Sequence, residues 1–151
     1  MALRAKHIWN MALFGAMFLV CMDRFLKVLS TVLWHNHPQH IFSSLNFVFI
    51  QNKNIAFSLK TGLDPLWIII PIIIFLTFYF FYLLKKQRLS EASAFFFILT
   101  GAMSNLYDRL LYGFVIDYID LQYFTVFNIA DVMICGGVVW LLFQIIQEKK
   151  K

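Results

Sequence analysis

Charged residues are scarce in this sequence. Lysine, arginine, aspartate and glutamate make up 14% of its 151 residues, whereas hydrophobic residues make up 61%. A chain of this length corresponds to one domain, and it could not hide so much apolar surface in a core of its own size. We therefore expect residues 1–151 to form a single domain that is embedded in lipid.

Cysteine is also rare, and histidine is confined mostly to one segment. Cys21 and Cys135 each lie in an apolar run without metal-ligand spacing, so we interpret them as small buried hydrophobic side chains. Three of the four histidines fall in the segment HNHPQH at 35–40. Because no rigid element fixes their geometry, an exposed loop is favoured over a metal site. No metal and no cofactor are expected.

Positive charge is concentrated beside the apolar runs. Eight of the thirteen basic residues lie at the two termini and in one mid-chain loop: Arg4, Lys6, Lys85, Lys86, Arg88, Lys149, Lys150 and Lys151. This distribution is typical of the flanks of membrane spans and does not indicate nucleic-acid binding. The positive-inside rule places this side, with both termini, in the cytoplasm. The aspartates then lie at or near the outer face: Asp23, Asp64, Asp108, Asp117, Asp120 and Asp131.

Four apolar runs have about the twenty residues that crossing a bilayer requires. They cover residues 8–28, 66–84, 92–111 and 127–147. The first begins like a cleaved signal peptide, but it continues past Asp23, so we interpret it as a retained span. The expected fold class is an all-α integral membrane protein with four transmembrane helices.

Two outer segments connect these spans. LNFVFIQ at 45–51 alternates as a strand does, and IAFSL at 55–59 resumes the pattern after a turn, which predicts a small β-hairpin or cradle. At the start of the second span, Asp64 is expected to be the N-cap residue and Pro65 the first helical residue. The segment 113–126 is too polar to cross and too apolar for open water, so we expect it in the membrane interface. Whether it is helical or extended is open, and with it the relative placement of Asp117 and Asp120.

Polar side chains of three spans converge at one depth. At about 1.5 Å per residue, Asp23 lies roughly 22 Å along the first span, and Asn105 and Asp108 lie roughly 20 and 24 Å along the third. Asp131 lies in the first turn of the fourth span, which enters from outside. Ionisable groups in membrane spans are costly and are therefore candidates for function.

Paired carboxylates could perform a reaction at this depth. Two that are held close share one proton, so together they can activate a water and protonate a carbonyl oxygen, without a metal or a covalent intermediate. Ser104 has no histidine near it that could make it a nucleophile. Two other interpretations are a proton-coupled transporter, which would need charge deeper in the spans, and a catalytically silent scaffold, which would tolerate Asp117→Asn and Asp131→Asn.

Five motifs occur in order along the chain: Asp23-x-x-x-Lys27, Asn52-x-x-x-Ala56-Phe57, Gly101-x-x-x-Asn105-x-x-Asp108-Arg109, Gly113-x-Val115-x-Asp117-x-Ile119-Asp120 and Phe127-Asn128-x-Ala130-Asp131. With these motifs the chain resembles the prolipoprotein signal peptidases (signal peptidase II), four-span aspartyl endopeptidases of the bacterial inner membrane. The resemblance covers essentially the whole chain.

The resemblance implies a catalytic pair, Asp117 and Asp131, which cuts before the lipid-modified cysteine of a diacylglyceryl-prolipoprotein. It implies a monomer in the inner membrane, with its site near the periplasmic face, lipid chains between the spans and the hairpin as a lid. Asp108 is expected to orient Arg109, and Asp23 with Lys27 to fix the outer end of the first span. The supporting and substrate-binding positions implied are Asp23, Lys27, Asn52, Gly101, Asn105, Asp108, Arg109, Asn128 and Ala130.

One motif departs from the family pattern. After Asn52 the family usually has a glycine and a small residue, whereas this chain has Asn54 and Ile55. Asn54 tolerates a positive φ better than most residues, so it suits the same turn. Ile55 is bulkier than the family residue, which leaves the fit of the lid and the substrate preference open.

Overall fold

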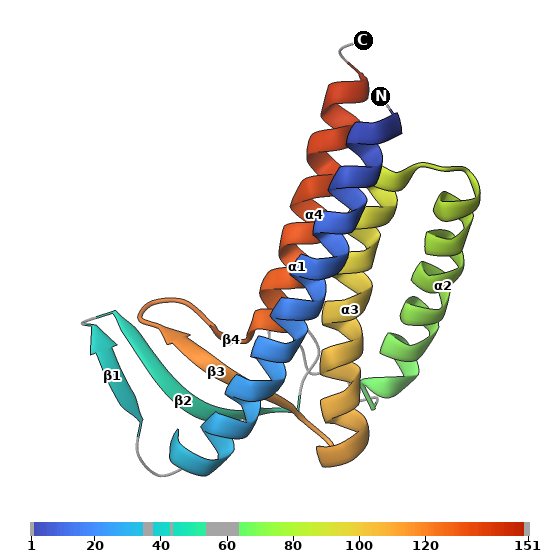
Figure 1. Cartoon of the computed structure of the whole chain (residues 1–151). Coiled ribbons are helices and arrows are strands. Elements are labelled where there is room, and N and C mark those ends of the chain that lie inside the picture. The colour runs from blue at the N-terminus through green and yellow to red at the C-terminus, as the bar shows by residue number, and fades with distance from the viewer. Residues whose placement is uncertain (1, 35–37, 43, 54–63, 150–151) are drawn as a thin grey trace.

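The computed structural model describes residues 2–34, 38–42, 44–53 and 64–149. It contains four long helices and a four-stranded sheet (Figure 1). The helices are α1 (Ala2–Leu29), α2 (Leu66–Lys85), α3 (Leu89–Tyr112) and α4 (Ile129–Glu148), and a π-helical turn (Ser30–Trp34) continues α1. The expected mostly helical fold with a small sheet is confirmed.

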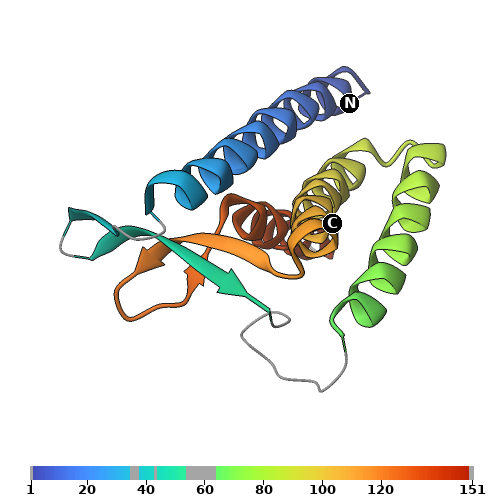
Figure 2. The same cartoon turned by 90° about the horizontal axis from the view of Figure 1, so that it is seen from below.

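Helix α3 is the centre of the helical part. It packs against α1, α2 and α4, and Figure 2 shows the other three helices around it. Both termini lie at one end of the helices, together with the connection between α2 and α3 (Figure 1). The sheet and the first turn of α4 lie at the opposite end, so the basic flanks and most of the aspartates are separated along the helices.

The sheet is antiparallel, with the strands in the order β1 (Gln39–Phe42), β2 (Leu45–Asn52), β3 (Val115–Leu121) and β4 (Val126–Phe127). The segment after α3 is therefore extended over most of its length. In a strand, residues three positions apart point to opposite faces, so Asp117 and Asp120 do not share a face. In the register of β2 and β3, Asp117 lies opposite Ile50 and Asp120 opposite Asn46.

The helix bounds agree closely with the apolar runs, but the evidence for crossing a membrane differs among the helices. Within the described residues, α2 and α4 are long and apolar enough to cross a bilayer by length and composition. Helices α1 and α3 carry charged residues within their length, among them Asp23 and Asp108. Four spans therefore stay a prediction, which α2 and α4 fit by length and composition.

Several local expectations need correction or fall outside the description. Cys21 and Cys135 are exposed on their helices and not buried, because they lie on faces that no other helix covers. The expected second hairpin strand at 55–59, with Asn54 and Ile55, lies outside the described residues, and β2 pairs instead with β1 and β3. His40 lies in β1, whereas the other two histidines of its segment are outside the description.

The start of α2 differs from the expectation by one residue. Pro65, and not Asp64, occupies the N-cap position, and the helix begins at Leu66. The carboxylate of Asp64 still accepts the N–H of Leu66 at 2.9 Å. The expected capping contact therefore forms one position further from the helix.

Close approach of α3 and α4 depends on two glycines. A Cβ on Gly101 would lie 2.5 Å from the carbonyl oxygen of Ala130. A Cβ on Gly137 would lie 2.6 Å from the Cγ1 of Ile98 and 2.7 Å from the carbonyl oxygen of Ala94. Both distances are shorter than van der Waals contact, so a side chain at either position would push the helices apart. Gly101 thus sets the distance between α3 and the first turn of α4.

Candidate active site

The first turn of α4 is closed by a reciprocal pair of hydrogen bonds. Oδ1 of Asn128 accepts the N–H of Asp131 at 2.9 Å, and Oδ2 of Asp131 accepts the N–H of Asn128 at 3.2 Å. This capping box satisfies N–H groups that the start of a helix leaves without an intrahelical partner. The Asp131 carboxylate is therefore fixed at the end of α4 that follows β4 (Figure 1).

Asp117 lies within β3, and its side chain is almost fully buried. Nδ2 of Asn52, at the end of β2, donates to its Oδ2 at 2.9 Å. Nδ2 of Asn128 donates to its Oδ1 at 2.7 Å. Asn128 therefore contacts both carboxylates, Asp131 through the capping box and Asp117 through its side-chain amide.

Asn105 connects α3 to the same group. Its Nδ2 donates to Oδ1 of Asp131 at 2.8 Å, and its Oδ1 accepts from Nζ of Lys27 at 3.0 Å and from Nδ2 of Asn128 at 3.2 Å. An ammonium group has only donors, so Lys27 requires the oxygen of the Asn105 amide to face it. The nitrogen of that amide then faces Asp131.

Burial dominates the electrostatics of Asp117. Removal from solvent raises the pKa of its carboxyl to about 6, the hydrogen bond from Asn52 opposes this rise, and the nearby charge of Asp131 adds to it. A carboxyl group that titrates near neutral pH can hold or release a proton under ordinary conditions. This is the property that acid–base chemistry requires.

Four charged side chains form an ion cluster between α1 and α3, made of Asp23, Arg24, Lys27 and Asp108. Nζ of Lys27 lies 3.0 Å from Asp23 and 2.7 Å from Asp108. Arg24 lies 3.1 Å from Asp23 and 2.7 Å from Asp108. Two cations therefore neutralise two carboxylates, which is the arrangement that makes buried charge tolerable.

The ion cluster changes the roles expected for two residues. Asp108 was expected to orient Arg109, but its carboxylate pairs with Arg24 and Lys27 and accepts the N–H of Ile116 at 3.3 Å. Arg109 instead donates from Nη1 to the carbonyl oxygen of Asn105 at 3.4 Å. The expected pair of Asp23 and Lys27 does form, and it joins α1 to α3 as well as bracing α1 itself.

The family model described as signal peptidase (SPase) II matches residues 15–147. The chain belongs to the signal peptidase II family. It is 34% identical over 138 residues to the lipoprotein signal peptidase of Syntrophomonas wolfei, covering 89% of this chain and 93% of that protein. It is also 34% identical over 128 residues to the lipoprotein signal peptidase of Caldicellulosiruptor bescii, covering 84% and 85% of the two chains.

Solved structures support the same fold. One bacterial membrane enzyme matches with a TM-score of 0.80 at 24% identity, covering 93% of this chain and 90% of that one. Another matches with a TM-score of 0.74 at 26% identity, covering 90% and 92%. The arrangement of helices and sheet is thus shared with enzymes of bacterial membranes.

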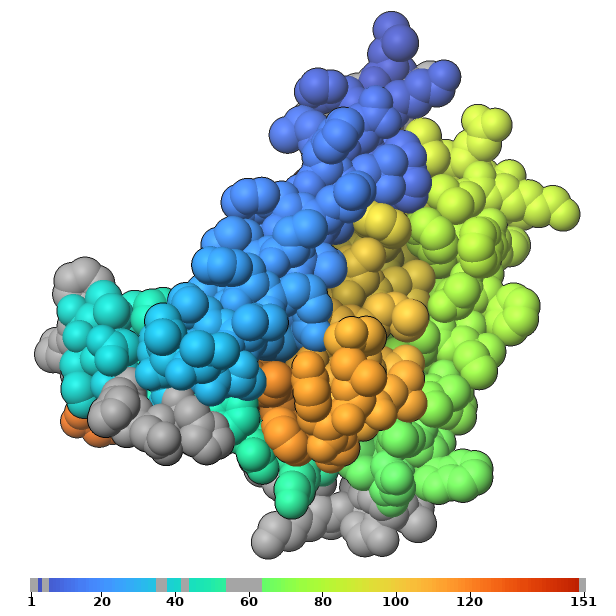
Figure 3. Space-filling model, turned by 60° about the horizontal axis from the view of Figure 1, so that its bottom comes forward, coloured from blue at the N-terminus to red at the C-terminus, as the bar shows by residue number. Residues whose placement is uncertain are grey.

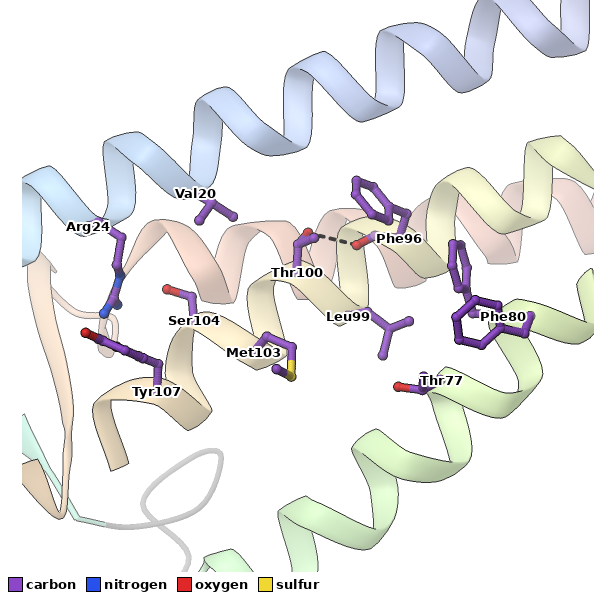
Figure 4. Close-up of a pocket in the computed structure, with 11 residues that line it drawn as sticks. Val20, Arg24, Thr77, Phe80, Phe96, Leu99, Thr100, Met103, Ser104 and Tyr107 are labelled. Atoms are coloured by element: carbon purple, nitrogen blue, oxygen red, sulfur yellow. Dashed lines mark hydrogen bonds between the residues drawn. The ribbon is translucent and has the colours of Figure 1, made fainter. Parts of the chain in front are cut away.

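The chain also has an apolar groove of about 550 Å³ between α1, α2 and α3 (Figure 4). Phe80, Leu99 and Met103 line most of its length, and Arg24 and Tyr107 lie at one end. In the space-filling view of Figure 3, the surface of α3 is visible between α1 and α2. Neither Asp117 nor Asp131 lines this groove.

Sequence reasoning missed three polar residues around the candidate site. Arg24 completes the ion cluster, Ser104 donates its hydroxyl to Oδ2 of Asp23 at 2.6 Å, and Tyr118 donates to Oδ1 of Asp23 at 3.0 Å. Arg24 was detectable as a cation within an apolar run, next to Asp23. Ser104 and Tyr118 carry no such signal, because serine and tyrosine are ordinary residues in a helix and a strand. Eight of the predicted residues lie in or directly beside the hydrogen-bonded groups around Asp23, Asp117 and Asp131. They are Asp23, Lys27, Asn52, Gly101, Asn105, Asp108, Asn128 and Ala130.

Proposed function

We propose that this chain is an aspartyl endopeptidase that removes signal peptides from diacylglyceryl-modified bacterial prolipoproteins. It cuts before the lipid-modified cysteine, and Asp117 and Asp131 together activate the attacking water. Family membership supports the peptidase activity, and the names of the relatives, lipoprotein signal peptidases, support the substrate.

The observation that carries the assignment of the pair is the set of donors around it. Each of the four carboxylate oxygens of Asp117 and Asp131 accepts a hydrogen bond from an amide N–H. Three of these donors are side-chain amides and one is the backbone N–H of Asn128. Amide donors stabilise a carboxylate and orient it without adding a full positive charge, so the shared proton is kept.

The chemistry follows from a pair that carries one proton. The ionised carboxylate takes a proton from water, the water oxygen bonds to the scissile carbonyl carbon, and the protonated carboxyl group donates its proton to the carbonyl oxygen. When the tetrahedral intermediate collapses, the C–N bond breaks and the leaving nitrogen takes a proton from the pair. One hydroxyl of the intermediate returns its proton to the pair as the carbonyl re-forms, so the pair again carries one proton. The raised pKa of Asp117, about 6, supports a pair in which one member keeps its proton to a higher pH than an ordinary carboxyl group does.

The other predicted residues have supporting roles in this proposal. Asn52, Asn105 and Asn128 hold the carboxylates. Gly101 and Ala130 let α3 approach the first turn of α4, and the ion cluster fixes α1 against α3. Arg109 lies one helical turn from Asn105 and supplies positive charge on the same helix.

Membrane placement is the second part of the proposal. Large apolar side chains cover the outside of the helices: Phe14 is 76% exposed, Trp67 78% and Phe78 72%. So much exposed apolar surface requires lipid around it. We infer that all four helices cross the bacterial inner membrane, with both termini and the basic α2–α3 connection in the cytoplasm and the pair near the periplasmic face.

The test is cleavage of a diacylglyceryl-modified prolipoprotein by the purified chain in detergent, with chelator present. Asp117→Asn and Asp131→Asn are each expected to abolish cleavage, because they remove an ionisable group while preserving shape. The matched control is Asp120→Asn, since Asp120 lies on the other face of β3 and binds Asn46 at 3.0 Å. Cleavage by either Asp117→Asn or Asp131→Asn would refute the assigned pair. No cleavage by the folded wild-type chain would favour a transporter or a scaffold.

A further inference from the structure

Tyr118 is fully buried and follows Asp117 in β3. Its hydroxyl has two partners from different helices. It donates to Oδ1 of Asp23 in α1 at 3.0 Å, and it accepts the N–H of Ile129 in α4 at 3.1 Å. One oxygen atom therefore links β3, α1 and the start of α4.

The direction of both hydrogen bonds is fixed by chemistry. The Ile129 N–H can only donate, so the hydroxyl oxygen accepts from it, and the single hydroxyl proton is directed to Asp23. Burial, together with the neighbouring Asp23 carboxylate, raises the pKa of Tyr118 above its ordinary value. The hydroxyl thus stays protonated and keeps both contacts.

The first turn of α4 relies on this link. The backbone N–H groups of Asn128 and Asp131 are satisfied within the capping box. The two between them have no acceptor in α4: Ile129 donates to Tyr118, and Ala130 donates to Oδ1 of Asp23 at 3.3 Å. Half of the N–H groups at this helix start are therefore held by other elements, which also fixes the position of the turn.

Asp23 is itself held firmly. Its Oδ2 receives hydrogen bonds from Ser104 at 2.6 Å and Arg24 at 3.1 Å, and Nζ of Lys27 lies 3.0 Å away. Its Oδ1 faces Tyr118 and Ala130. Oδ2 of Asp23 thus belongs to the ion cluster, whereas Oδ1 binds the start of α4. Tyr118 is bound to Oδ1.

We propose that Tyr118 is a positioning residue for the peptidase reaction: its hydroxyl anchors the first turn of α4 to α1 and β3 and so fixes the position of Asp131 relative to Asp117. This role rests on the proposed function, in which Asp117 and Asp131 form the catalytic pair. Tyr118 itself contacts neither carboxylate of that pair through its hydroxyl. It acts through the backbone of Ile129.

The test compares Tyr118→Phe with Ser104→Ala. Both substitutions remove one buried hydroxyl that donates to Asp23, but the Ser104 hydroxyl binds Oδ2, which faces the ion cluster, whereas Oδ1 faces the start of α4. A general loss of stability would therefore affect both, whereas loss of the α4 anchor would affect only Tyr118→Phe. Activities are divided by the folded fraction, measured from thermal unfolding in the same detergent.

Tyr118→Phe is expected to lower kcat about tenfold with an unchanged KM, the size expected for one lost hydrogen bond to a buried group. Hydrogen exchange in the peptide containing residues 128–131 should become faster. Ser104→Ala should leave kcat within about twofold and exchange in this peptide unchanged. Equal losses of kcat in both variants, or unaltered kcat in Tyr118→Phe, would overturn the proposal.

A second variant cuts the same contact from the helix side. Ile129→Pro removes the N–H at the first helical position, where proline is tolerated, and Asn128 before it has the extended conformation that proline requires. Combined with Tyr118→Phe, it should lower kcat no further than Ile129→Pro alone. Additive losses would contradict the shared contact.

The two proposals fail in different ways. If Asp131→Asn still cleaves, the catalytic pair is wrong, while faster exchange in Tyr118→Phe would still report a lost anchor. If Asp131→Asn is inactive and exchange in Tyr118→Phe is unchanged, the pair stands and the anchoring role of Tyr118 is wrong.

Discussion

Nδ2 of Asn128 lies 2.7 Å from Oδ1 of Asp117. The donor belongs to the residue that caps α4, and the acceptor belongs to a strand of the sheet. The start of the helix and the middle of the strand are thus joined by one side chain. Because Asn128 also forms the capping box with Asp131, it sets the relative position of both carboxylates.

Asn128→Asp separates the two roles of this side chain. Aspartate caps a helix as well as asparagine does, so the capping contribution should be retained. The donor to Asp117 is lost, and a third carboxylate is added beside the pair. We expect a loss of cleavage of at least about a hundredfold, an effect of the size seen when a positioned donor is removed from an active site. A steady-state assay on folded protein measures it, and cleavage within a few-fold of wild type would argue against the donor role.

Stability should depend on pH through Asp117. Its pKa is raised from 3.8 to about 6, so the protonated form is favoured by folding. The associated stabilisation is complete below about pH 4 and is lost as the pH rises through about 6, a change on the order of 3 kcal/mol. Thermal unfolding in detergent between pH 4 and 7.5 should show a smaller decline with pH for Asp117→Asn than for wild type. Parallel curves would show that Asp117 is not perturbed.

Adjacent glycines in α4 should respond in opposite directions to alanine. Gly137→Ala places a Cβ against Ile98 and the carbonyl oxygen of Ala94, which should cost about 1–3 kcal/mol. At Gly136 a Cβ meets nothing within 4 Å, so Gly136→Ala should stabilise the helix by up to about 1 kcal/mol. Melting temperatures of the two variants test this directly, and equal shifts would contradict the close packing of α3 and α4.

Charge balance in the ion cluster predicts a rescue. Lys27→Met leaves two carboxylates with Arg24 alone and should destabilise the protein by about 3–5 kcal/mol. Adding Asp108→Asn removes the excess negative charge, so the double variant should be more stable than Lys27→Met alone. The four proteins of this cycle are compared by thermal unfolding. A double variant that is less stable than both single variants would show that the cluster does not act through charge balance.

The positions of the helices could be predicted from the sequence, and so could the shared depth of the polar side chains in three of them. Both depend on spacing along the chain. The long apolar runs became α1 to α4 with bounds shifted by a few residues, and LNFVFIQ became β2. Asn105 and Asp131 were expected at one depth, and a hydrogen bond of 2.8 Å joins them. These features need no knowledge of how the elements pack.

Features that depend on packing could not be predicted. Whether Asp117 and Asp120 share a face depends on β3 being extended, and its pairing with β2 determines that. The partner of Asp108 is decided by how α1 lies against α3, which brings Arg24 and not Arg109 to its carboxylate. Tyr118 gave no signal because its contacts come from residues 95 and 11 positions away.

The anchoring of α4 has a consequence for how the protein is made. Asn128, Asp131 and the two anchored N–H groups all belong to α4 or its N-cap, whereas their partners Asp23, Asn105, Asp117 and Tyr118 precede α4 in the chain. Because synthesis runs from the N-terminus, these partners leave the ribosome before α4 does. The arrangement around the proposed pair can therefore form only after α4 has been made and has packed against the earlier helices.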